Sequence, residues 1–145
     1  MALVDVGRRA GGGAATPASW SGGRAAAARF GFRAVSGSAT QTADTKTGDS
    51  DSLWASGGGV GVDPKPCRTL ATGLTRADRE GVDDVGYIRA VLDDLPLHYR
   101  VDRRRVYVMG YSGGAFMAHR LACELADRVA AVASVEGDLV TYPCR

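Results

Sequence analysis

The chain has 145 residues, which is enough for one domain with a real core. Its 18 basic and 16 acidic side chains give a formal charge of only +2, so no electrostatic footprint for nucleic acid or an anionic membrane is expected. No apolar run is long enough to cross a membrane. Arg8 and Arg9 interrupt the apolar start where a signal peptide would continue, so no export signal is expected in this sequence.

The first part of the chain, residues 1–80, is poorly patterned and is expected to be partly disordered. Residues 2–6 and 32–35 are short apolar runs that predict strands, and residues 25–30 predict a helical turn or two. Residues 36–52 are almost wholly polar and predict a loop.

Patterning sharpens in residues 81–145. Apolar side chains recur at helical spacing from Val82 to Leu95, and Pro96 is expected to stop that helix. Residues 106–109 predict a buried strand, residues 114–127 a second helix, and residues 129–135 another buried strand. This alternation predicts an α/β fold with a mostly parallel sheet.

A strand-to-helix turn at Gly110-Tyr111-Ser112-Gly113-Gly114 carries the chemistry. The pattern G-x-S-x-G is weak alone, but between a strand and a helix it indicates a nucleophilic serine in a strained turn. Gly110 and Gly114 are the small neighbours such a turn needs, Ser112 is the candidate catalytic residue, and the Gly113 N–H is the candidate oxyanion-hole donor. Two alternatives are that Ser112 merely caps the helix, or that the glycines bind a dinucleotide, although the spacing is not G-x-G-x-x-G.

The residues around this turn resemble a known family. Residues 81–89 read Gly-Val-Asp-Asp-Val-Gly-Tyr-Ile-Arg, residues 99–102 Tyr-Arg-Val-Asp, and residues 105–115 Arg-Val-Tyr-Val-Met-Gly-Tyr-Ser-Gly-Gly-Ala. Residues 117–124 and 129–137 continue the similarity. Together they resemble the polyhydroxybutyrate depolymerase-like esterases, a group of the α/β-hydrolase superfamily that includes feruloyl and acetylxylan esterases. Trp54-Ala55-Ser56-Gly57-Gly58 is similar to a tryptophan-containing loop of that family.

The resemblance implies a partial α/β-hydrolase fold that is truncated after the strand following the nucleophile helix, with residues 1–80 a degenerate start of the domain. It implies a serine-dependent carboxylic-ester hydrolase that forms an acyl-enzyme on Ser112. The substrate would be a polyhydroxyalkanoate, its oligomers or a plant cell-wall ester, with no cofactor or metal. It also implies an extracellular protein. Family members place the triad acid and histidine later in the chain than this sequence extends, so neither is carried over.

The remaining polar candidates favour structural roles. His119 lies seven residues after Ser112 on the same helix, about 10 Å along its axis, and His98 lies in a solvated loop. Asp83 and Asp84 are placed to cap a helix. The three cysteines, Cys67, Cys123 and Cys144, lack zinc-ligand spacing; one disulfide with a free thiol and three free thiols both stay open.

Three functions compete. The first is the serine esterase, and the second is an inactive truncated fragment or pseudoenzyme without the triad Asp and His. The third is a small module that binds an anion at the glycine-rich turn.

Overall fold

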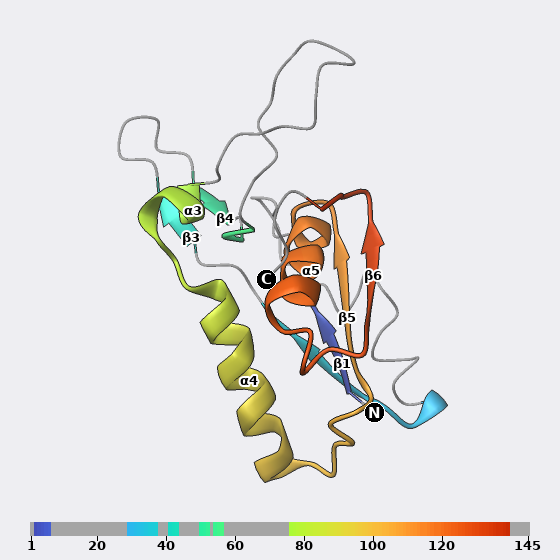
Figure 1. The fold of residues 1–145 in the computed structure, drawn as a ribbon. Helices are drawn as coiled ribbons and strands as arrows, with labels where there is room; N and C mark the ends of the chain where they lie inside the picture. The colour runs from blue at the N-terminus through green and yellow to red at the C-terminus, as the bar shows by residue number, and fades with distance from the viewer. Residues whose placement is uncertain are drawn as a thin grey trace.

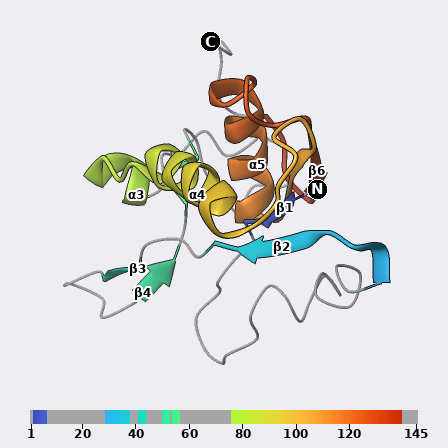
Figure 2. The ribbon, with the colours of Figure 1, turned by 90° about the horizontal axis from the view of Figure 1, so that it is seen from below.

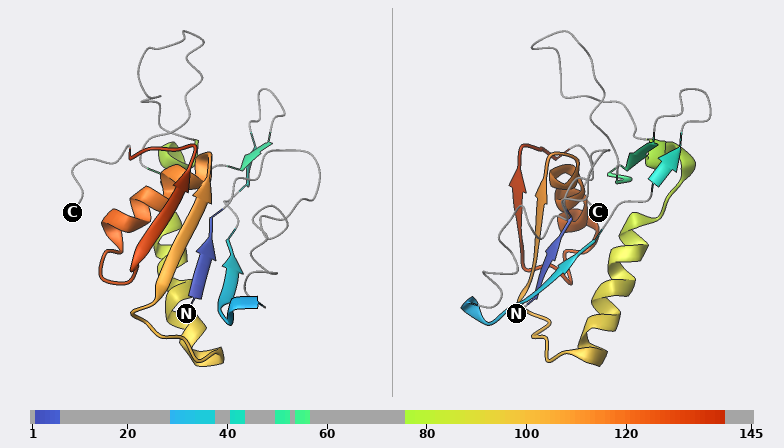
Figure 3. Two further views of the ribbon diagram at one scale, coloured as in Figure 1. Left: turned by 90° about the vertical axis from the view of Figure 1, so that its right-hand side faces the viewer. Right: turned by 180° about the vertical axis from the view of Figure 1, so that it is seen from behind.

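The computed structural model describes residues 2–6, 29–37, 41–43, 50–52, 54–56 and 76–139 (Figure 1). Its central feature is a four-stranded sheet. The strands are β1 (Ala2–Asp5), β2 (Arg33–Ser36), β5 (Val106–Tyr111) and β6 (Ala131–Val135), in the spatial order β2-β1-β5-β6. All neighbouring pairs are parallel, and Figure 3 shows the four arrows pointing the same way. The predicted α/β fold with a parallel sheet is confirmed.

One face of this sheet is covered by the two longer helices. These are α4 (Asp84–His98) and α5 (Gly113–Glu124), which lie side by side against the strands (Figures 2 and 3). A shorter helix, α3 (Arg76–Glu80), precedes α4. The α4 and α5 helices lie on the same face because both belong to connections that lead in the same direction across the sheet, from β2 to β5 and from β5 to β6.

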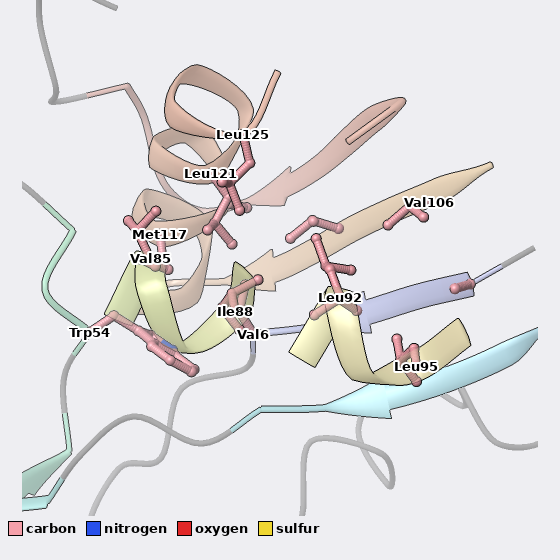
Figure 4. Close-up of a cluster of buried hydrophobic side chains, with 14 residues drawn as sticks. Val6, Trp54, Val85, Ile88, Leu92, Leu95, Val106, Met117, Leu121 and Leu125 are labelled. Atoms are coloured by element: carbon pink, nitrogen blue, oxygen red, sulfur yellow. The ribbon is translucent and has the colours of Figure 1, made fainter. Parts of the chain in front are cut away.

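The hydrophobic core lies between the sheet and these helices. A row of valines crosses the sheet at one level, since Val35 pairs with Val4, Val4 with Val108, and Val108 with Val132. Paired residues of parallel strands point to the same face, and this row meets the helices. Figure 4 shows the helix side chains that pack here, which are Val85, Ile88, Leu92, Leu95, Met117, Leu121 and Leu125.

The sheet has a switch point between β1 and β5. From β1 the chain continues to β2 on one side, whereas β5 lies on the other side of β1. Sites in parallel α/β sheets form at the carboxyl ends of strands that flank such a point. Val6, just past β1, donates its N–H to the Met109 carbonyl at 2.8 Å, which ties the end of β1 to β5. Ser112 follows the last residue of β5.

Three expectations differ from the structure. The first helix does not stop at Pro96 but continues to His98. A proline in a last turn forfeits one hydrogen bond without breaking the helix, and the Tyr99 N–H still reaches the Leu95 carbonyl at 2.9 Å. The last strand, β6, was expected to be buried, but alternate residues are exposed because they point away from the helices on a strand at the edge of the described sheet.

The third difference lies in the polar stretch expected to be a loop. Two short strands, β3 (Gln41–Ala43) and β4 (Ser50–Ser52), pair antiparallel there. The predicted strands at residues 2–6 and 32–35 are confirmed as β1 and β2. Most of the expected helical turn at residues 25–30, and most of residues 1–80, lie outside the described residues.

Candidate active site

Ser112 occupies a strained backbone conformation. Its φ is 52° and its ψ is −117°, and among the described residues only one other non-glycine residue, Glu136, has a positive φ. Side-chain-bearing residues adopt such angles only where their surroundings hold them, and they concentrate at functional sites. Ser112 stands between the end of β5 and the start of α5, which is the context that the sequence predicted.

Gly110 has no room for a side chain. A Cβ atom there would overlap the carbonyl group of Gly114 and would lie 2.8 Å from the Ala115 nitrogen. The first turn of α5 therefore packs directly on the backbone of β5. The sequence argument that this position must be small is confirmed in its steric sense, whereas the catalytic roles given to Ser112, Gly113 and the flanking glycines stay predictions.

Ser112 is not a side-chain cap of the helix. It occupies the N-cap position of α5, but its side chain makes no capping hydrogen bond. The alternative in which the hydroxyl serves only to cap the helix is therefore wrong. Gly113 is the first residue of α5, where backbone N–H groups lack partners within the helix and carry the positive end of its dipole. Such an N–H suits an oxyanion donor.

The end of β6 and the turn after it support the serine, and sequence reasoning missed this contact. The Ser112 N–H donates to the Val135 carbonyl at 2.9 Å, and the Ser134 hydroxyl donates to the Gly137 carbonyl at 3.1 Å. A Cβ atom on Gly137 would overlap that of Ala115. The positive φ of Glu136, 58°, belongs to the same turn. The one signal in the sequence was a glycine that closes an apolar strand.

The chain's two histidines lie apart from Ser112. His98 was expected in a loop but is the last residue of α4; it is exposed, and its Nε2 lies 3.3 Å from the Asp94 carboxylate one turn earlier. His119 lies two turns into α5 and is partly buried. Neither is brought to the nucleophile turn, as the sequence indicated.

Asp83 and Asp84, which the sequence assigned to a helix start, have different tasks. Asp83 is the N-cap of α4 and accepts the Gly86 N–H at 2.8 Å. Asp84 is only 3% exposed, and its carboxylate accepts the Ala55 N–H at 2.7 Å. Burial raises the pKa of Asp84, while the Ala55 hydrogen bond and the Arg120 charge act in the lowering direction.

Two further observations bear on cofactors and redox state. The described part of the chain contains no group of three or more His, Cys, Asp or Glu side chains placed to hold a metal ion. Cys123 is disulfide-bonded, which settles the question left open for this thiol. Both other cysteines, Cys67 and Cys144, lie outside the described residues.

No described helix is both long and apolar enough to span a bilayer.

Comparison with known proteins finds two relatives that are named as esterases and match part of this chain. The chain is 50% identical over 60 residues to NocK of Nocardia uniformis subsp. tsuyamanensis, which is named as an esterase, covering 41% of this chain and 17% of NocK. It is 29% identical over 66 residues to the bifunctional acetylxylan esterase/xylanase XynS20E of Neocallimastix patriciarum, covering 46% of this chain and 10% of that protein. The chain thus spans less than a fifth of either relative. No family model and no solved structure matches it.

Proposed function

We propose that the chain carries the nucleophile segment of a serine-dependent carboxylic-ester hydrolase, with Ser112 as the nucleophile. The observation that carries the proposal is the backbone of Ser112, held at a φ of 52° at the end of a central parallel strand. The esterase names of both relatives support the same reaction class.

The chemistry follows the general course of acyl transfer. The Ser112 Oγ attacks the ester carbonyl, and its proton passes through a general base to the leaving alcohol. The Gly113 N–H stabilises the oxyanion of the tetrahedral intermediate, and water then releases the acid from the acyl-enzyme. A donor of this kind contributes about 3–4 kcal/mol to the transition state.

The substrate would be an ester of a polymer, either a polyhydroxyalkanoate or its oligomers, or a plant cell-wall ester. The acetylxylan esterase name of one relative favours the second. The disulfide at Cys123 favours an oxidising, extracellular location, because such bonds are rare in the reducing cytosol. Release of acetate from acetylated xylan, compared with release of hydroxybutyrate from polyhydroxybutyrate, would separate the two substrate classes.

One observation favours a second function, a chain that keeps the nucleophile turn without its activity. Neither His98 nor His119 is placed to serve as the general base of Ser112. Without a base, the serine would lose several orders of magnitude in rate.

Incubation of the purified chain with a fluorophosphonate probe tests both. Phosphonylation of Ser112, located by mass spectrometry and absent in Ser112→Ala, would support the esterase. No reaction in the wild type, or equal labelling in Ser112→Ala, would reject the esterase for this chain and favour the inactive form.

A further inference from the structure

A buried polar cluster lies beside the nucleophile helix and has no part in the reaction as proposed. Its centre is Ala55, in the buried segment Trp54–Ser56. The N–H of Ala55 donates to the Asp84 carboxylate at 2.7 Å, and the carbonyl of Ala55 accepts from the Arg120 guanidinium. Both backbone polar groups of Ala55 are thus held by side chains, one from α4 and one from α5. We call this arrangement the Ala55 clamp.

Arg120 is itself fixed from two further sides. Its Nε donates to the Glu124 carboxylate at 2.6 Å, one turn along α5, and its Nη1 lies 3.8 Å from the Asp78 carboxylate on α3. The Asp78 side chain is only 5% exposed, and that of Arg120 is 23% exposed. A charge-assisted hydrogen bond in so little solvent is stronger than one on the surface, and its geometry is more restricted.

The clamped segment lies at the edge of the sheet where the strands end. A Cβ atom on Gly37, the residue after β2, would lie 3.2 Å from the Trp54 ring and 3.5 Å from Ile88 of α4. Trp54 is 1% exposed and belongs to the core cluster that includes Val6, the residue after β1 (Figure 4). The segment is therefore packed where β1 and β2 end, and the clamp joins it to the helix that begins at the nucleophile.

We propose that Asp84 and Arg120 are positioning residues of the site at Ser112. By holding both sides of Ala55, they fix helix α5 relative to the ends of β1 and β2, which lie at the same edge of the sheet as Ser112. Reacting groups on separate elements must keep their geometry to about 0.5 Å, so an added anchor between those elements affects the rate. This role rests on the proposed esterase function.

The experiment uses the full chain in a Trp20→Phe background, which leaves Trp54 as its one tryptophan. The test variants are Asp84→Ala and Arg120→Met, and the conservative variants are Asp84→Asn and Arg120→Lys. Asp93→Asn is the matched control, since it removes the charge from a 2.7 Å ion pair between Arg128 and α4 that does not touch the clamp. Far-UV circular dichroism and the urea midpoint establish that each variant is folded.

Two quantities are measured on each folded variant. Acrylamide quenching of Trp54 reports whether the segment stays buried, and the maximal rate of fluorophosphonate labelling, separated from the apparent affinity for the probe, reports the geometry at Ser112. We expect both test variants to expose Trp54 and to lose roughly ten- to hundredfold in maximal labelling rate. Asp84→Asn retains an acceptor for Ala55 and should recover most of this loss, and Asp93→Asn should match the wild type.

The outcomes separate the two proposals. Quenching of Trp54 that is unchanged in both test variants would overturn the clamp, and so would an exposed Trp54 with labelling at the wild-type rate. If Asp84→Ala does not fold, the decision rests on Asp84→Asn and Arg120→Lys. A loss of labelling rate in these conservative variants as large as that in Arg120→Met would reject a role specific to the Ala55 hydrogen bonds. Failure of the proposed function is distinct, because the wild type itself would then not be labelled.

Discussion

Gly137 and Ala115 are in direct contact across the candidate site, with the turn after β6 packed on the first turn of α5. A Cβ atom on Gly137 would overlap the Ala115 methyl group and lie 3.0 Å from the Phe116 nitrogen. The last residue of β6, Val135, accepts the Ser112 N–H through its carbonyl. The conformation of the serine is thus supported by a strand that follows it in the chain.

The first prediction concerns this contact. Gly137→Ala forces either the turn or the start of α5 to shift, because both partners are backbone or short side chains. We expect a loss of about 1–3 kcal/mol in the free energy of unfolding, measured by urea titration. Leu139→Ala, at an exposed position two residues later, should stay within about 0.5 kcal/mol of the wild type. Equal stability of Gly137→Ala and the wild type would show that the contact is loose.

The second prediction concerns strain at Ser112. Glycine adopts a positive φ without a steric penalty, so Ser112→Gly should raise the free energy of unfolding by about 1 kcal/mol while removing any probe labelling. Ser112→Ala keeps the strain and removes a hydroxyl that makes no cap bond, so its stability should change by less than about 0.5 kcal/mol.

A serine that stabilises α5 by capping would give a different result. Its replacement by alanine would then cost about 1 kcal/mol. Ser134→Gly serves as the control, because Ser134 lies inside β6 and donates to the Gly137 carbonyl, so glycine there should destabilise the chain. If Ser112→Gly destabilises the chain, the interpretation that the backbone of Ser112 is strained is wrong.

The sequence predicted those features of the fold that depend on local patterns. The apolar runs at β1, β5 and β6 and the helical spacing from Val82 to Leu95 were sufficient for the α/β alternation. The extension of α4 past Pro96 was missed, because a proline rule for helix interiors does not hold where the last turn needs few hydrogen bonds. The exposure of β6 depends on which strand occupies the edge, which no local pattern encodes.

In the candidate site, too, local features were predictable from the sequence and long-range contacts were not. Ser112 and Gly110 were found because their requirement is local, within one strand and one turn. The Ala55 clamp was not found, because it joins residues 29 and 65 positions apart. Asp84 was assigned to the helix dipole from its place in the first turn; its bond to Ala55 depends on tertiary packing that the polar, irregular sequence around residue 55 does not indicate.

The third prediction concerns the disulfide at Cys123. Reduction should lower the free energy of unfolding by about 2–4 kcal/mol, since the bond restricts the unfolded chain. Titration of the denatured, unreduced chain should find one free thiol among its three cysteines. Cys123→Ser should match the reduced wild type in stability and be insensitive to reductant. Three reactive thiols in the oxidised preparation would contradict the bond.

The last prediction concerns the pH dependence of stability at Asp84. Burial raises the pKa of this carboxyl above its ordinary value of 3.8, so the folded state takes up the proton before the unfolded state does as the pH falls. The contribution of Asp84 to folding is therefore most favourable below the unfolded pKa and is lost as the pH rises through the folded pKa. Asp84→Asn carries no such proton, and its amide oxygen still accepts from Ala55.

Urea titrations of the wild type and Asp84→Asn between about pH 7 and about pH 4.5 measure this effect. We expect the wild type to gain stability relative to Asp84→Asn as the pH falls. The opposite trend would mean that the attraction of Arg120 outweighs burial and holds the pKa below its ordinary value. Asp84→Ala should be about 1–3 kcal/mol less stable than Asp84→Asn at every pH, because it leaves the N–H of Ala55 buried without an acceptor. A pH-dependent difference between Asp84→Ala and Asp84→Asn would show that another group titrates with the clamp.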